Sequence, residues 1–462
     1  MSKKTVDLGT GSIGKLLFTL ALPAIVAQIV NVLYNIVDRI FIGKIPNGDI
    51  AMAGVGVAFP IILIVSAFSA LIGMGGAPLA AIKMGEKDND GAEKIVSNSF
   101  SSLIIIAILL TVGFLIFSEP ILWAFGASDA TIGYAKEYLN LYLIGTIFVQ
   151  IALGMNPFIN TQGFAKVGMT TVMIGAVINI VLDPIFIFGL DMGVKGAALA
   201  TLLGQMVSAI WVLFFLFGKK SILKIRKEYL KPNLKIIIPI VTLGVSPFIM
   251  QATESLVLIS LNNQLASYGG DLAVGAMTIM SSILQILMLP IIGLTQGSQP
   301  IMSYNYGAKN FDRVKKTFKL LLMACLFYSV TMWGLLMIVP EFFVGIFNNK
   351  KELVEITSWS IRIFFAGTFI LGAQIACQQT FLALGQAKVS LVLALLRKVI
   401  LLIPLVFILP MFVEGNALKL QMVLTAEPVA DIVAAMATLT CFVIFMKKMF
   451  KKVDNVLDET KA

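Results

Sequence analysis

Long apolar runs constrain the fold of this chain more than any other feature. A transmembrane helix needs about 20 apolar residues, and the first run, residues 16–42, exceeds that length. Only 13% of the 462 residues are charged, whereas a soluble domain carries about 25%. The runs are also far longer than the strands of a membrane barrel. The sequence therefore predicts an all-α polytopic membrane protein.

The apolar runs and the Gly, Pro and charged residues between them predict twelve spans. An even number places both ends of the chain on one side of the membrane. With the N-terminus in the cytoplasm, the internal loops hold most of the lysines and arginines, as the positive-inside rule requires. We therefore expect a multi-pass protein of a bacterial-type plasma membrane with both termini cytoplasmic. The expected spans are residues 16–42, 51–82, 96–117, 138–160, 168–190, 197–217, 236–266, 272–303, 318–346, 357–383, 389–412 and 421–446.

Short motifs repeat at a nearly constant offset, which indicates an internal duplication. The matching motifs are Gly75-x-x-Pro78 with Gly297-x-x-Pro300, Gly145-Thr146 with Gly367-Thr368 and, less strictly, Pro23 with Pro247. Six spans per half make the repeats parallel, as in alternating-access transporters whose substrate site lies between the halves. We expect an N-lobe of residues 1–217, a basic cytoplasmic linker of residues 218–235, and a C-lobe of residues 236–462 that ends in a basic tail.

Polar residues of the first run lie on one helix face. Gln28, Asn31, Asn35 and Asp38 are spaced three, four and three positions apart, so they predict one wall of a polar cavity. A carboxylate in a membrane is costly and is a functional candidate by default. The alternative is a structural ion pair, although the adjacent Arg39 does not face Asp38 in a helix.

A second polar cluster lies in the fifth and sixth spans. Asn179 and Asp183 are four positions apart and share a helix face, and Thr201 follows in the next span. Pro184 frees a backbone carbonyl, so the cluster offers the oxygen ligands of a small hard cation. The alternative is a kinked helix in which Asp183 caps local backbone. Together with Asp38, the cluster predicts a coupled carboxylate pair that binds a proton or Na⁺.

Prolines and further polar residues complete the candidate transport machinery. Pro23, in the same helix as Asp38, predicts a hinge, and Pro184 predicts a second one. Glu254, in the seventh span, would attract a cationic substrate or a second ion. Hydrogen bonding between packed helices is the alternative for each polar residue. The candidate substrate-binding residues are Gln28, Asn31, Asn35, Asn156, Glu254, Ser255 and Gln285.

The last two spans carry a separate set of charges. Arg397 and Lys398 lie in the eleventh span, and Glu427 and Asp431 share a face of the twelfth. The simplest interpretation is a structural ion pair between these two helices.

Several classes of protein are excluded. The chain has no histidine, no Walker A loop and no hydrolase motif, so we expect neither an enzyme nor an organic cofactor. No soluble stretch is long enough for a nucleotide-binding module. The three cysteines lie in apolar runs and predict no disulfide framework. The basic residues lie in short loops, as topology determinants do, so the net charge of +10 does not indicate nucleic-acid binding.

These residues resemble the MATE (multidrug and toxic compound extrusion) family. Pro23 and Asp38 in the first span, with the Asp183-Pro184 motif, carry the resemblance, and the stretch ALPAIVAQIVNVLYNIVDRIFIGK is similar to the bacterial MepA-like branch. The resemblance implies cation-coupled export of lipophilic, mostly cationic drugs or metabolites. It also implies an N-lobe cation site at the positions that match Asp38, Asn179, Asp183, Ala197 and Thr201, with Ala197 contributing its backbone.

One part of the family pattern is missing. NorM-like members use an acid of the seventh helix, matched here by Glu254, together with an acid of the tenth helix. Residues 364–384 contain no Asp or Glu, and this absence favours the N-lobe as the coupling site.

We therefore expect a monomeric antiporter for lipophilic cations that contacts membrane lipid and uses H⁺ or Na⁺. The sequence does not choose between the two ions, because both bind the same oxygens. The nearest alternative is a flippase for a lipid-linked saccharide, which would need a strongly cationic cavity to hold pyrophosphate.

Overall fold

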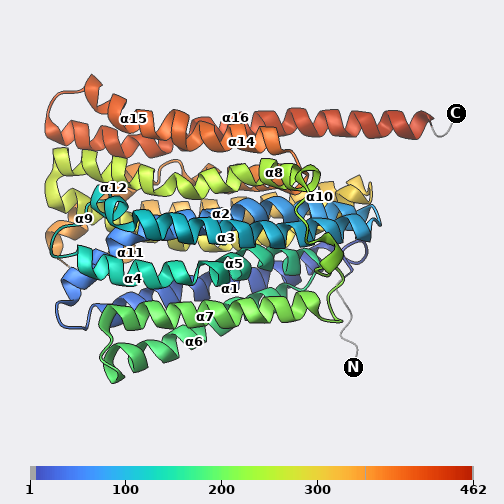
Figure 1. Ribbon diagram of the computed structural model, residues 1–462. Helices are drawn as coiled ribbons and strands as arrows, with labels where there is room; N and C mark the ends of the chain where they lie inside the picture. The colour runs from blue at the N-terminus through green and yellow to red at the C-terminus, as the bar shows by residue number, and fades with distance from the viewer. Residues whose placement is uncertain (1–6, 349, 460–462) are drawn as a thin grey trace.

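The structure is a computed structural model that describes residues 7–348 and 350–459 (Figure 1). Within those residues it is helical and has no strand. Residues 1–6 and 460–462, at the outer ends of the two predicted lobes, lie outside the described residues. The helices of the first half are α1 (Ile13–Ile42), α2 (Gly48–Gly85), α3 (Asn89–Ala124), α4 (Ile132–Ile144), α5 (Thr146–Thr161), α6 (Ala165–Pro184), the π-helix η1 (Ile185–Gly189) and α7 (Gly193–Phe217).

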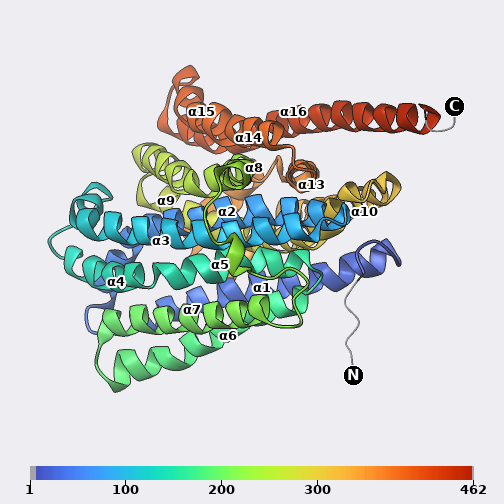
Figure 2. The same cartoon turned by 45° about the vertical axis from the view of Figure 1, so that its right-hand side comes forward.

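The second half repeats this pattern with more interruptions. The short 3₁₀-helix η2 (Lys227–Tyr229) precedes it. Its elements are α8 (Leu234–Ala252), α9 (Glu254–Gly307), α10 (Phe311–Ile338), α11 (Pro340–Gly345), α12 (Lys351–Phe364), α13 (Thr368–Ala383), α14 (Ala387–Leu395), the π-helix η3 (Leu396–Leu402), α15 (Ile403–Ile408), the 3₁₀-helix η4 (Leu409–Phe412) and α16 (Asn416–Glu459). The start of α1 and the end of α16 lie at the same end of the helix bundle (Figures 1 and 2).

The described residues contain nine helical segments that are long and apolar enough to cross a membrane, or eleven if each of two bent pairs counts as one span. The pairs are α4 with α5, bent by 58°, and α12 with α13, bent by 51°. The bends lie at the repeated Gly145-Thr146 and Gly367-Thr368 motifs, so the duplication includes the kinks. The predicted fourth and tenth spans, residues 138–160 and 357–383, each contain one of these bends, which the sequence analysis did not predict.

One continuous apolar segment covers two predicted spans. Residues Leu234–Gly307 form 74 residues of almost unbroken helix. Gly270 interrupts it with φ 63° and ψ −160°, values that glycine adopts without the clash a Cβ would cause. The predicted spans 236–266 and 272–303 lie on either side of this glycine. A second break, at Thr253 between α8 and α9, falls inside the seventh span and was not predicted.

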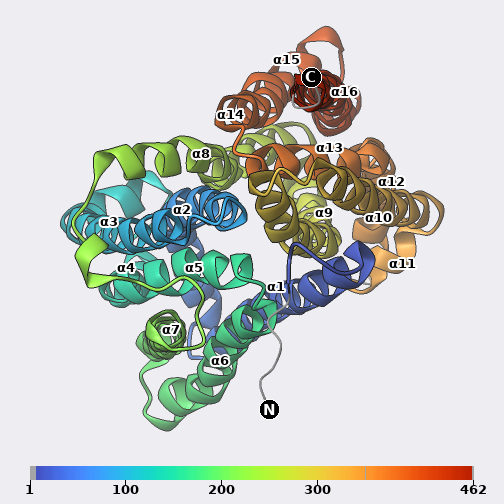
Figure 3. The ribbon, with the colours of Figure 1, turned by 90° about the vertical axis from the view of Figure 1, so that its right-hand side faces the viewer.

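The two halves of the chain pack against each other through small residues. Helix α2 contacts α8, and α1 contacts α9; Figure 3 shows these four helices from the end of the bundle where α1 begins. A Cβ on Gly75 would lie 2.2 Å from the carbonyl oxygen of Ile240, and one on Gly297 would lie 2.5 Å from the Cα of Ala21. The repeated glycines therefore let equivalent helix pairs approach closely at two related places.

The segment between the halves is fixed to the first half. Glu93 of α3 accepts hydrogen bonds from the backbone N–H of Lys224 at 3.1 Å and from Nε of Arg226 at 2.8 Å. The side-chain carbonyl of Gln162 accepts from the backbone N–H of Leu223 at 2.9 Å. The predicted linker, residues 218–235, thus lies against α3 and the end of α5.

Candidate functional site

The sequence pattern Asn179, Asp183 and Thr201 forms one buried cluster between α6 and α7. Nδ2 of Asn179 donates to Oδ1 of Asp183 at 3.3 Å and to Oγ1 of Thr201 at 3.2 Å. The three side chains are 2%, 0% and 9% exposed, respectively. A single amide group thus bridges the two helices and holds the carboxylate and the hydroxyl on the same side of the cluster.

Helix α6 ends directly beside this cluster. Helix α6 ends at Pro184, and the π-helix η1 follows. Proline cannot continue the backbone ladder because it has no N–H, and single π-turns often occur at functional sites. A Cβ on Gly196 of α7 would lie 2.7 Å from the backbone of Phe186, so a small residue is required where η1 crosses α7. Ala197, the next residue, is fully buried.

Asp38 brings a second carboxylate to the cluster from α1. Its side chain is 7% exposed, and it lies close enough to Asp183 for their charges to repel each other. Among the described residues, neither carboxylate forms an ion pair; Arg39 instead stacks over the ring of Phe59, 5.2 Å from its centroid. The structural ion pair considered as the alternative for Asp38 is therefore absent from the described part of the chain.

Three buried oxygens of the cluster have no hydrogen-bond donor among the described residues. They are Oδ1 of Asp38, Oδ1 of Asn179 and Oδ2 of Asp183. A buried acceptor without a partner is unfavourable, and a proton or a hard cation with a preference for oxygen would satisfy it. The atoms that could ligate a metal are all oxygens, which fits an alkali cation better than a transition metal. No group of three or more His, Cys, Asp or Glu residues that could hold a metal occurs in the part of the chain that the structure describes.

Three tyrosines around the cluster were missed by the sequence analysis. Tyr138 of α4 is buried, lies near Asp38, and hydrogen-bonds with Thr201. Tyr34, one turn before Asp38 on α1, interacts with the same carboxylate, and the buried Tyr142 lies near Tyr34. Tyr34 and Asp38 are four positions apart, as are Tyr138 and Tyr142, so helical spacing was the available signal.

The predicted substrate-binding residues are spread over several helices. Gln28 donates to Oε1 of Gln296 at 3.4 Å and so faces α9. Asn35 donates to the backbone carbonyl of Asn31 at 2.7 Å. Asn156 donates to the carbonyl of Gly168 at 3.2 Å and joins α5 to α6, which is the interhelical contact considered as the alternative for it. On α9, Ser255 is half-buried and Gln285 is exposed.

The predicted ion pair between the last two spans is confirmed for Arg397 and wrong for Lys398. Arg397 contacts both Asp431 at 2.7 Å and Glu427 at 2.9 Å. Lys398 instead donates to Glu254 and, at 2.7 Å, to the carbonyl of Met250. Adjacent helical residues point in different directions, so Arg397 faces α16 while Lys398 faces the break between α8 and α9.

Known proteins are similar to this chain over most of its length. The family described as MatE matches residues 23–185 and 247–408. The multidrug export protein MepA of Staphylococcus haemolyticus (strain JCSC1435) is 25% identical over 398 residues, and that of Staphylococcus aureus (strain NCTC 8325 / PS 47) is 26% identical over 395 residues. Each alignment covers 86% of this chain and 87% of the relative.

Solved structures show the same fold. The MATE multidrug transporter DinF-BH, solved in complex with a ligand, is 34% identical, with a TM-score of 0.88, and the match covers 96% of this chain and 98% of that one. A MATE crystal structure in a bent conformation matches with a TM-score of 0.90 at 23% identity, over 98% of this chain and 99% of that one. The predicted all-α membrane fold is thereby confirmed.

Proposed function

The chain belongs to the MATE family of multidrug efflux transporters, and on that premise we propose that it is a cation-coupled antiporter that exports lipophilic, mostly cationic drugs or metabolites by alternating access. It is a multi-pass membrane protein and not an enzyme. The coupling ion is H⁺ or Na⁺, and it binds in the first half of the chain at Asp38, Asn179, Asp183 and Thr201, with the backbone of Ala197 beside them.

The observation that carries this proposal is the carboxylate pair formed by Asp38 and Asp183. Both side chains are buried, neither is neutralised by a basic partner among the described residues, and each has an oxygen without a donor. Binding of a proton or a cation stabilises such a pair. Exchange follows if the ion and the substrate favour different states of the protein, or compete for one state.

The buried apolar clusters support the expected division into lobes in part, because two of them combine residues of both halves. One buried apolar cluster contains only residues between Ile42 and Ala198, and another contains only residues between Val257 and Ala430. The N-lobe (residues 1–217) and C-lobe (residues 236–462) would then move as units, with 218–235 as the linker and Pro23 and Pro184 as hinges. The contacts between the halves at Gly85 and Gly307, which each approach the other half's backbone, lie at the end where α1 begins, so with cytoplasmic termini this conformation is closed toward the cytoplasm.

The substrate class rests on the relatives. Those at about 25% identity are named multidrug export proteins, and DinF-BH is described as a multidrug transporter. We assign the substrate contacts to the polar residues of α1, α5 and α9, with Glu254 as the acid that attracts a cation. These residues are Gln28, Asn31, Asn35, Asn156, Glu254, Ser255 and Gln285.

The test is efflux of a fluorescent lipophilic cation from proteoliposomes in which proton and sodium gradients are imposed separately. The variants are Asp38→Asn and Asp183→Asn, which remove charge and keep shape. Asp191→Asn is the matched control, because Asp191 is exposed in the turn before α7. We expect efflux to follow one gradient, to be lost in both site variants, and to persist in the control.

Two outcomes would contradict the proposal. Unchanged efflux in both site variants would remove the carboxylate pair from the coupling mechanism. No efflux from the wild type under either gradient would exclude the proposed substrate class and favour the flippase.

A further inference from the structure

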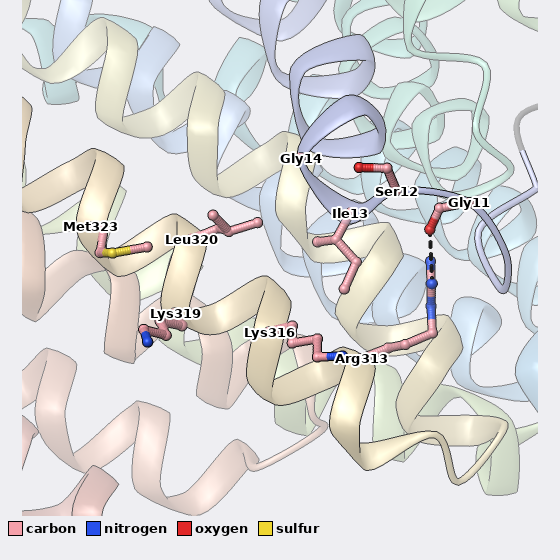
Figure 4. A pocket seen from close by; sticks show the side chains of 9 residues that line it. All are labelled: Gly11, Ser12, Ile13, Gly14, Arg313, Lys316, Lys319, Leu320 and Met323. Carbon is pink, nitrogen blue, oxygen red and sulfur yellow. Dashed lines mark hydrogen bonds between the residues drawn. The ribbon is translucent and has the colours of Figure 1, made fainter.

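A pocket of about 530 Å³ lies between the start of α1 and the first turns of α10. Figure 4 shows its two kinds of lining. Arg313, Lys316 and Lys319 supply positive charge, and Ile13, Leu320 and Met323 supply apolar surface. Among the described residues, no acidic side chain lines the pocket. Asp312 lies in the first turn of α10, and the charge of Asp7 interacts with that of Arg313.

Arg313 holds the wall of this pocket in place. Its Nη1 donates to the carbonyl of Gly11 at 2.9 Å, and its Nη2 donates to the carbonyl of Thr10 at 3.1 Å. Its Nε donates to Oδ1 of Asn305 at 3.1 Å. Arg313 therefore joins the segment before α1 to α9 and α10, and these hydrogen bonds are with neutral acceptors, while the carboxylate of Asp7 interacts with its charge.

The two lysines are available to a ligand. Lys316 and Lys319 are exposed, and neither forms an ion pair in the part of the chain that the structure describes. They are three positions apart on α10 and so project from one face of the helix. The positive end of the α1 helix dipole lies at the same pocket. The pocket thus concentrates positive charge without any compensating carboxylate from the described residues in its wall.

The cationic face of α10 continues into an apolar one. Met323 is 47% exposed, Phe327 is 77% exposed and Val330 is 46% exposed. These residues follow Lys316 and Lys319 at helical spacing and lie on the same side of α10. Because α10 is long and apolar enough to cross a membrane, we expect this exposed apolar stripe to face lipid.

We propose that the pocket binds the phosphate head group of an anionic phospholipid, with its acyl chains along the exposed apolar stripe of α10. Basic pockets between transmembrane helices on the cytoplasmic side suit such head groups. A soluble phosphate would use the lysines and leave Leu320 and Met323 without a role. Since α1 and α10 belong to different halves of the chain and touch each other, the lipid bridges the halves and favours the conformation described here.

The test is native mass spectrometry of the delipidated full chain with dioleoyl phosphatidylglycerol or dioleoyl phosphatidylcholine. The test variant is Lys316→Gln/Lys319→Gln. The matched control is Lys447→Gln/Lys448→Gln, which removes two exposed adjacent charges from α16. We expect the wild type and the control to prefer phosphatidylglycerol, and the test variant to lose about tenfold or more in affinity for it. Lys316→Arg/Lys319→Arg should retain the preference, which separates loss of charge from misfolding.

Three results would overturn the proposal. One is an unchanged lipid preference in Lys316→Gln/Lys319→Gln. Another is an equal loss in the control pair, which would indicate general surface charge. The third is displacement of phosphatidylglycerol by inorganic phosphate at low millimolar concentration, which would show that the site recognises phosphate and that the acyl chains add little to binding.

Discussion

Lys398 and Glu254 form an ion pair that ties the π-helix η3 to the first turn of α9. The two partners differ in environment: the Lys398 side chain is 9% exposed, whereas that of Glu254 is 48% exposed. The charge of Lys398 is therefore compensated only by this pair and by the Met250 carbonyl among the contacts described, whereas almost half of the Glu254 side chain remains exposed. A cationic substrate that approaches Glu254 would compete with Lys398.

Replacement of Lys398 by methionine should strengthen the binding of cationic substrates. The change keeps an unbranched side chain and frees the carboxylate of Glu254. Because the carboxylate partner, Glu254, is half-exposed and water screens its charge, the pair contributes about 1 kcal/mol or less, which corresponds to at most about a fivefold lower Kd. Equilibrium binding of a fluorescent lipophilic cation measures this, with Lys398→Arg as the control that retains the pair. An unchanged Kd in Lys398→Met would mean that Glu254 does not contact the substrate.

The opposite change, Glu254→Gln, should lower stability more than Lys398→Met does. It leaves the ammonium of the buried Lys398 with only the Met250 carbonyl, and an uncompensated buried charge is strongly unfavourable. Lys398→Met instead leaves a half-exposed carboxylate that water can solvate. Thermal unfolding of both purified variants in the same detergent shows which of the two is less stable. Greater loss in Lys398→Met would contradict the environments described for the two residues.

Arg397→Met should destabilise the second half of the chain by roughly 3–5 kcal/mol, because it leaves two buried carboxylates without a cation. Glu427 and Asp431 are 6% and 2% exposed. The triple variant Arg397→Met/Glu427→Gln/Asp431→Asn removes all three charges and should recover much of the loss. Thermal unfolding of the single and triple variants is the measurement. If the triple variant were no more stable than the single one, the charges would not be the source of the effect.

Much of the fold follows from the length of the apolar runs, from the Gly, Pro and charged residues between them, and from the internal repeat. The positions at which helices bend or break do not. The Gly145-Thr146 and Gly367-Thr368 repeat was visible in the sequence, yet nothing in a Gly-Thr pair specifies a bend of 58° or 51°. The break at Thr253 has no proline at its position, and it places Glu254 in the first turn of a new helix. The partner of Lys398 could not be predicted for the same reason, since it depends on that break.

The candidate cation site was more predictable than its surroundings. Asn179 and Asp183 are linked by helical spacing, and an acid in an apolar run stands out in any sequence. Tyr138 does not stand out, because aromatic residues at helical spacing are ordinary in a helix core. Only the packing of α4 against α7 brings its hydroxyl to Thr201.

Tyr138→Phe should weaken binding of the coupling ion by about fivefold, since a hydrogen bond contributes about 1 kcal/mol. The change removes only the hydroxyl that meets Thr201 and keeps the ring that fills the space. Tyr134→Phe, on the same helix and half-buried, is the matched control. The concentration of H⁺ or Na⁺ that gives half-maximal efflux reports the effect. Equal shifts in the two variants would mean that Tyr138 has no particular role at the site.

Gly75→Ala should disturb the packing between the two halves. A Cβ at this position would lie 2.2 Å from the Ile240 carbonyl, and the atom it meets is backbone, so α2 and α8 must separate. The conformation closed at the end where α1 begins is then disfavoured, and we expect lower thermal stability and slower efflux. Gly113→Ala is the control, because a Cβ there meets no atom within 4 Å and alanine favours a helix. Normal efflux and stability in Gly75→Ala would show that the halves adjust to an added methyl group, and the repeated glycine would then have no packing role.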